Sequence, residues 1–68
     1  MLKYRVDVLG KRAGPDKREL VEQHWFDDGA VAMATYKYHR DNPGERVQVV
    51  ALYDRRTPGR PVAREYCR

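Results

Sequence analysis

The stretch that decides the fold is Trp25-Phe26-Asp27-Asp28-Gly29-Ala30-Val31-Ala32-Met33-Ala34, where a strand pattern stops at two acids and a helix-forming run begins. An aspartate at such a junction can accept hydrogen bonds from the unpaired amides of a first helical turn. Its negative charge also suits the positive end of the helix dipole. The junction therefore predicts a helix that starts after Asp27 or Asp28 and divides the chain into hairpin, helix and hairpin.

The helix predicted over residues 30–41 has one apolar stripe at helical spacing, formed by Ala30, Val31, Ala34 and Tyr38. We expect this stripe to face the sheet. Positions two apart lie on different sides of a helix, so we expect Tyr36 to be exposed. Pro43 favours an end near residue 41, because proline disfavours helical geometry in the residue before it.

Strand patterns flank the helix on both sides. Residues 2–8 alternate apolar and charged side chains, which is typical of a strand with one buried face. Residues 19–26 have mixed faces, which favours an edge position or a bulge. Between them, residues 10–17 hold two glycines, a proline and several charges, and they are predicted to form a long hairpin loop.

The second half of the chain predicts another hairpin. Residues 45–54 carry apolar side chains on both faces, as a central strand does. A turn over residues 55–60, with Pro58-Gly59 at its centre, leads to a last strand over residues 62–67. Because neighbouring elements usually pack together, we expect one α+β domain over residues 1–68, with a ββαββ order, a four-stranded antiparallel sheet in the order 2-1-3-4 and the helix on one face.

A single helix leaves the other face of such a sheet uncovered. If Val47, Val49, Ala51 and Tyr53 face the helix, then Val50 and Leu52 lie on the open face. Trp25 fits either the core or an interface. Exposed apolar area commonly marks an interaction surface, so we expect a non-enzymatic protein-binding module that acts sterically. Its expected partner contacts are Trp25, Val50, Leu52, Tyr36, Arg55, Arg56, Arg60 and Arg64.

Charge is segregated along the chain. The net charge is +4, and residues 1–18 and 55–68 are strongly basic while residues 19–54 are acidic. Such basic ends attract an acidic protein or a phosphate backbone. The alternative function is therefore nucleic-acid binding through Lys11, Arg12, Lys17, Arg18, Arg55, Arg56 and Arg60, although the expected strand order puts these two clusters at opposite ends of the sheet.

Partner and location follow from coarser features. The expected partner is an acidic protein or a second copy of the chain, and the size suits a stand-alone regulator or inhibitor of the kind that phages and mobile elements encode. One cysteine, Cys67, excludes an internal disulfide and favours the cytoplasm. The sequence has no apolar run near the length of a membrane span and no signal-peptide pattern, so neither a membrane nor export is expected.

No catalytic, cofactor or metal site is predicted. Helix capping explains Asp27 and Asp28 more simply than acid–base chemistry does. His24 and His39 lie fifteen residues apart, without a metal-binding spacing or a second cysteine. Cys67 is the penultimate residue, where precise catalytic geometry is hard to hold, and the glycines of residues 10–17 lack the lysine-serine or lysine-threonine step of a phosphate-binding loop.

Overall fold

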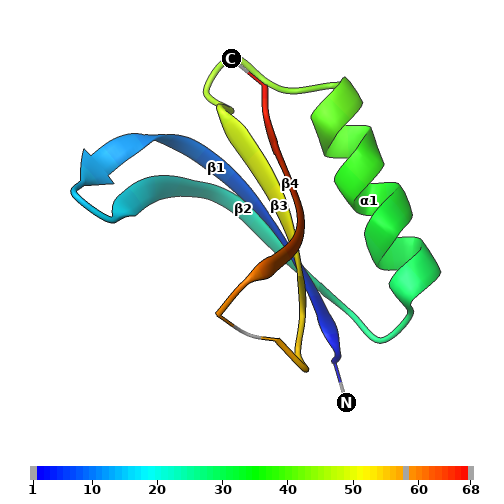
Figure 1. The fold of residues 1–68 in the computed structure, drawn as a ribbon. Coiled ribbons are helices and arrows are strands. Elements are labelled where there is room, and N and C mark those ends of the chain that lie inside the picture. The colour runs from blue at the N-terminus through cyan, green and yellow to red at the C-terminus, as the bar shows by residue number, and fades with distance from the viewer. Residues whose placement is uncertain (1, 58, 68) are drawn as a thin grey trace.

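A computed structural model describes residues 2–57 and 59–67. The elements follow the order β1 (Tyr4–Gly14), β2 (Lys17–Phe26), α1 (Gly29–Asp41), β3 (Val49–Asp54) and β4 (Pro61–Tyr66). The four strands form one antiparallel sheet in the order β2-β1-β3-β4, and α1 lies across one face of it (Figure 1). The predicted fold class, element order and strand order are confirmed.

The first hairpin is tighter than predicted. β1 continues to Gly14 and β2 begins at Lys17, so only the two residues between them turn the chain. The long loop expected over residues 10–17 is therefore wrong. Irregularities in the β1–β2 register, from Val8 onward, let the ladder continue through this stretch. Gly10 is needed there, because a Cβ at this position would lie 2.9 Å from the carbonyl oxygen of Arg46.

The helix starts at the predicted junction. Asp28 is the N-cap, and its Oδ1 accepts hydrogen bonds from the backbone N–H groups of Ala30 at 2.8 Å and Val31 at 3.4 Å. At the other end, both the backbone N–H and the side-chain amide of Asn42 donate to the carbonyl of Tyr38. Both ends of α1 thus satisfy backbone groups that an isolated helix leaves unpaired.

The predicted orientation of the helix about its axis is wrong. Ala32 and Tyr36 are buried, whereas Val31 is 48% and Tyr38 is 63% exposed. A Cβ on Gly29 would lie 3.0 Å from the ring of Tyr4, so the missing side chain lets the helix start close to β1. Ala32, one turn later, keeps this approach close, and Tyr36 continues the same side of the helix. Burial, followed by the charge of Glu65, raises the pKa of Tyr36 above its ordinary value.

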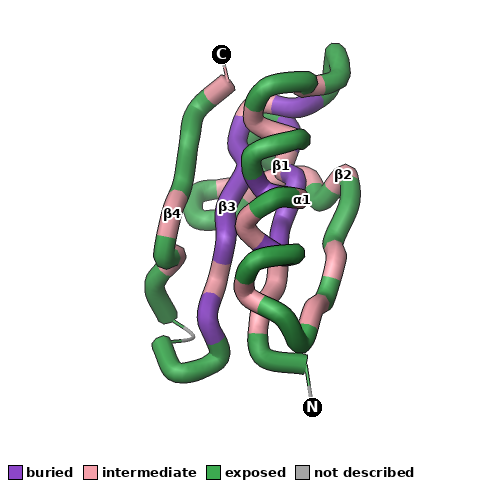
Figure 2. Tube along the Cα trace, turned by 90° about the vertical axis from the view of Figure 1, so that its right-hand side faces the viewer, coloured by how far each residue is buried: buried purple, intermediate pink, exposed green. Residues whose placement is uncertain are grey.

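The two faces of β3 are also exchanged relative to the prediction. Val50 and Leu52 are 0% and 3% exposed and pack in the core with Val6, Val8 and the helix. Figure 2 shows that the buried stretches of β1 and β3 lie next to α1. They do not lie on the open face, and neither does Tyr36, so these expected partner contacts are core residues. The physical reason is that the alternation of faces does not continue from residue 45 into β3. Residues 45–46 form a turn, and Val47 is buried in the core although it lies before the strand begins.

Val49 and Ala51 occupy the side of β3 that points away from the helix, and they too are buried. The strand register places Tyr66 and Leu9 beside Val49, and Arg64 and Asp7 beside Ala51. Side chains of the uncovered face therefore shelter the apolar centre of that face. β4 ends at Tyr66 rather than at residue 67, and Pro58, at the centre of the expected turn, lies outside the described residues.

The orientation of α1 predicts opposite effects for its two tyrosines. Tyr36→Ala removes a buried ring and should lower the free energy of unfolding by about 3 kcal/mol. Tyr38→Ala removes an exposed ring and should change it by less than about 0.5 kcal/mol. Urea unfolding followed by circular dichroism measures both values. A larger loss for Tyr38→Ala would contradict the observed packing of the helix.

Candidate functional site

The candidate site is the face of the sheet that α1 does not cover, which we call the open face. In β1 its side chains alternate with those of Val6 and Val8, so Arg5 and Asp7 point to it. The register adds Trp25 of β2 and Tyr53 of β3, which lie on either side of Arg5. Arg5 and these two aromatic residues form one row across three neighbouring strands, which we call the Arg5 cluster.

The guanidinium of Arg5 lies against both rings of this cluster. Its carbon is 4.2 Å from the ring centroid of Tyr53 and 5.6 Å from that of Trp25. Cations at these distances are attracted by the negative face of an aromatic ring. Trp25 is 50% exposed, so one of its ring surfaces remains accessible although the other approaches Arg5.

A buried acid fixes the position of Arg5. Its Nε lies 3.1 Å from Oδ1 of Asp7, and the Gln23 side-chain amide donates to the same oxygen at 3.0 Å. Asp7 is only 7% exposed. The Nε–H of Arg5 is buried. Its contact with Asp7 is an ion pair, but the geometry of this contact is not that of a hydrogen bond. Arg5 is therefore held by charge and ring contacts rather than by a network that would occupy its whole guanidinium.

A second arginine–aromatic cluster lies toward the other end of the open face. The ring centroid of Tyr66 is 5.5 Å from the guanidinium carbon of Arg64 and 5.7 Å from that of Arg18. Arg18 Nη1 donates at 3.1 Å both to the carbonyl of Gly10 and to Oε1 of Gln48, which holds it beside the ring. We call these three residues the Tyr66 cluster. Tyr66 is 58% exposed.

Each cluster borders a hollow. The Arg5 cluster meets one of about 270 Å³, whose lining also includes Leu2, Lys3, Asp54 and Arg55. The Tyr66 cluster meets one of about 300 Å³ beside the hairpin turn, whose lining also includes Leu9, Arg12, Pro15, Asp16 and Lys17. Lysines and arginines thus outnumber acids around both hollows.

The acidic side chains of the chain are largely engaged elsewhere. Glu22 and Glu65 lie on the helix side of the sheet, because they pair with Val8 and Val50. Asp28 caps the helix, and Asp41 pairs with Arg40. Glu19 forms an ion pair with Arg46 at 2.6 Å. The charge separation seen along the sequence is thus only partly a separation between the two sides of the sheet, because Asp7 lies on the open face and Asp54 and Asp16 line the hollows.

The predicted basic clusters are only partly brought together. The turn between β1 and β2 and residues 55–57 after β3 lie at opposite ends of the sheet, as expected (Figure 1). Arg12, Lys17 and Arg18 meet Arg64 around the second hollow. Lys11 lies instead near Glu19, Glu45, Arg46 and Gln48. Arg55 lines the first hollow, Arg60 is exposed, and Arg56 is held by Asp54 through an Nη2–Oδ2 contact of 2.8 Å.

Sequence reasoning missed Arg5, Tyr53 and Tyr66 as members of one surface. Each lies in an alternating strand pattern, but the pattern gives only two sides and not which side the helix covers. The cross-strand register, which places Arg5 between Trp25 and Tyr53, is a tertiary feature. Trp25, which the sequence left open between core and interface, is half exposed.

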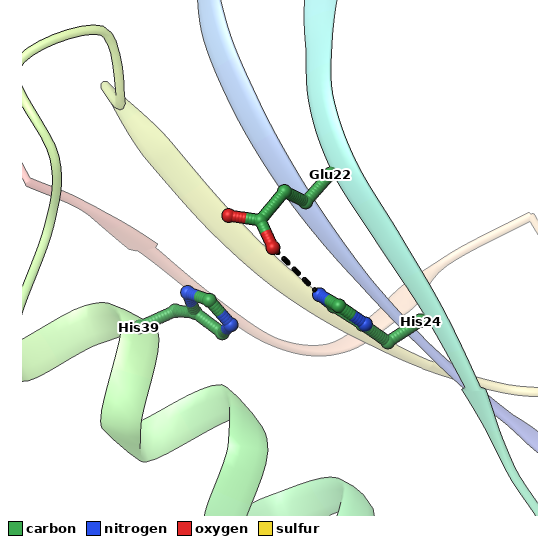
Figure 3. Close-up of side chains that lie close together, drawn as sticks. All are labelled: Glu22, His24 and His39. Atoms are coloured by element: carbon green, nitrogen blue, oxygen red, sulfur yellow. Dashed lines mark hydrogen bonds and ion pairs between the residues drawn. The ribbon is translucent and has the colours of Figure 1, made fainter.

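The fold also unites the two histidines. His24 and His39 stack with ring centroids 5.5 Å apart, and Glu22 Oε1 lies 3.0 Å from His24 Nε2 (Figure 3). One potential ligand atom from each of the three residues lies within 4.8 Å of the others. These are the residues that the described part of the chain offers for a metal, and they lie on the helix side of the sheet, away from the open face.

Comparison of the chain with models of protein families, with curated proteins and with solved structures gives no match. Among the described residues, no helix combines the length and the apolar character needed to cross a bilayer.

Asp54, beside the first hollow, predicts an acid-sensitive contribution to stability. Hydrogen bonds from the side chain and then from the backbone N–H of Arg56 hold the pKa of the Asp54 carboxyl below its ordinary value. A lowered pKa in the folded state stabilises the fold above about pH 4, where the unfolded carboxyl is ionised, and this contribution is lost as the pH falls through the folded value.

Asp54→Asn should therefore lower the free energy of unfolding at neutral pH. The difference from the parent should shrink as the pH falls below about 4. Urea unfolding across this pH range measures it. A difference that is constant with pH would contradict the assigned role of the Asp54 charge.

Proposed function

We propose that the open face binds single-stranded nucleic acid. The observation that carries the proposal is the placement of arginines against exposed aromatic rings on one sheet face, where lysines and arginines outnumber acids around both hollows. Proteins that bind single strands combine a positively charged surface with aromatic side chains on which bases stack. The open face supplies both components.

The aromatic component favours a single strand over a duplex. Trp25 and Tyr66 are half exposed, so each offers ring surface to an unpaired base. In a duplex the base faces are already stacked on one another, and only the phosphates and groove edges are accessible. Each base stacked on an aromatic side chain contributes about 1–3 kcal/mol.

The cationic component supports contact with the phosphates. Arg64 and Arg18 flank Tyr66, and Lys3 and Arg55 lie with Arg5 around the first hollow. An arginine that stacks on one ring can still direct its N–H groups to a phosphate, because its donors lie in the guanidinium plane. The same residues thus serve both stacking and charge neutralisation.

The two clusters define a path across the sheet. Trp25 on β2 and Tyr66 on β4 belong to the two outer strands, which lie about 14 Å apart across three strand spacings. In the strand register Trp25 lies level with Arg5 of β1, and Tyr66 lies level with Leu9 of β1. The two aromatic residues are therefore also separated by about 13 Å along the strand direction. A strand of several nucleotides would run diagonally from one cluster to the other.

Protein binding, the function first expected from the sequence, loses part of its basis. Val50 and Leu52 belong to the core, and Val49 and Ala51 at the centre of the open face are buried, so neither pair supplies the exposed apolar contact that was expected. A face-to-face dimer would also bring the arginines of two copies together, and like charges oppose such contact. An acidic protein remains the second candidate, because Trp, Tyr and Arg are also the residues enriched at interface hot spots.

Salt dependence separates the two candidates. Binding to a fluorescent single-stranded oligonucleotide should weaken steeply with salt, by about 0.7 log units per log unit of salt for each phosphate neutralised. Arg64→Ala should reduce the steepness of this salt dependence by about the contribution of one phosphate contact. Lys37→Ala, which removes an exposed charge from the helix, is the matched control and should leave the slope unchanged. Absence of oligonucleotide binding at low salt would overturn the proposal and favour the acidic protein.

Aromatic substitutions test the stacking component. Trp25→Ala and Tyr66→Ala should each weaken oligonucleotide binding by about 5- to 150-fold, the equivalent of about 1–3 kcal/mol. Tyr38→Ala removes an equally exposed ring from the outer side of α1 and should leave binding unchanged. Fluorescence anisotropy with DNA and RNA oligonucleotides of equal sequence measures these changes. Equal losses for all three variants would contradict a site on the open face.

A further inference from the structure

We propose that Glu22, His24 and His39 form a binding site for a divalent transition-metal ion of the zinc class. His24 and Glu22 lie two residues apart on β2, which puts both on the helix side of the sheet. His39 comes from the last turn of α1. Figure 3 shows the three side chains converging between the strand and the helix. The proposal concerns the side of the sheet opposite the open face and does not depend on the proposed function.

The geometry is close to that of a bound ion. Zinc with bonds of about 2.0–2.1 Å to nitrogen and oxygen places tetrahedral ligand atoms about 3.3 Å apart. Glu22 Oε1 and His24 Nε2 are already 3.0 Å apart, and all three potential ligand atoms lie within 4.8 Å of one another. Rotations about side-chain bonds would bring the three ligand atoms to the distances of a bound ion. Glu22 is exposed and both histidines are only half-buried, so these side chains have room to rotate.

The ligand types select the ion. Imidazole nitrogen suits zinc, copper and nickel, whereas magnesium and calcium prefer sites made of oxygen alone. Two histidines and one glutamate leave a fourth zinc position for water, a ligand set also found in open zinc sites. Zinc is therefore the probe, and magnesium is the control ion that the site should reject.

The location gives the ion a structural effect. β2 is an outer strand, and only two residues separate the end of β2 from the start of α1. His39 lies near the opposite end of the helix from this connection. An ion held by His24 and His39 would tie the C-terminal end of α1 to β2. Because the ion would bind the folded state and not the unfolded state, it would raise the thermal unfolding midpoint.

Sequence spacing concealed this cluster. The two histidines lie fifteen residues apart, and the strand-to-helix connection brings them together by reversing the chain. The prediction of no metal site was based on that spacing. The spacing no longer argues against a site, because the two rings lie 5.5 Å apart in the folded chain.

The test titrates zinc into the full chain without a histidine tag, by calorimetry and by thermal unfolding. One equivalent of zinc should bind and raise the unfolding midpoint, and the same concentration of magnesium should not. His39→Asn should weaken zinc binding by about tenfold or more and abolish the thermal shift. Glu22→Gln changes only an exposed side chain, so its folding is preserved, and it should also weaken binding.

The control variant is Cys67→Ser, because a thiol is also able to bind zinc and Cys67 lies outside the cluster. Cys67→Ser should keep both the stoichiometry and the thermal shift. If zinc binding is lost in Cys67→Ser, or if it persists undiminished in both Glu22→Gln and His39→Asn, the site is elsewhere and the proposal is overturned. Failure of the parent chain to bind zinc overturns it as well.

Discussion

The close docking of α1 on β1 is the constraint on which the rest of the structure depends. Gly29 lies against the ring of Tyr4, and Ala32 and Tyr36 continue the contact along the same side of the helix. This contact decides which face of the sheet is inside. Since the register couples all four strands, Val50 and Leu52 become core residues and the row of Arg5 faces outward.

The sequence was sufficient for the fold but not for the choice between alternative faces. Alternation, the Asp28 cap and the turn residues are local signals, and together with the packing of neighbouring elements they predict the element order and the strand order, although not the extent of the first hairpin. The helix has two stripes that could be buried, one through Val31 and Tyr38 and one through Ala32 and Tyr36, and hydrophobicity favours the first. The second stripe is buried because Gly29 and Ala32 are small and let the helix lie close to β1. A pattern of apolar residues in the sequence does not indicate where two backbones approach so closely.

The same distinction holds for the candidate site. The sequence indicated basic surface at both ends of the chain, and Arg18 and Arg64 do lie on one face. It could not indicate that Arg5 stands between Trp25 and Tyr53, because this depends on the pairing of three strands. A prediction from local patterns therefore identifies part of the site, including Trp25, Arg18 and Arg64, but not the pairing of arginines with aromatic rings.

The pairing of arginine with aromatic rings accounts for how a basic sheet face can exist in so small a domain. Arginine chains laid over Tyr53 and Tyr66 cover apolar surface with their stems and keep their charge near solvent. In the strand register Tyr66 lies beside Val49 and Arg64 lies beside Ala51, so these side chains help to bury the two residues without a second helix. An incoming base that stacks on Trp25 or Tyr66 would extend these contacts rather than disrupt the core. In the proposed function, stability and binding would therefore be served by the same side chains, whereas the histidines on the opposite side could act on the helix without changing this face.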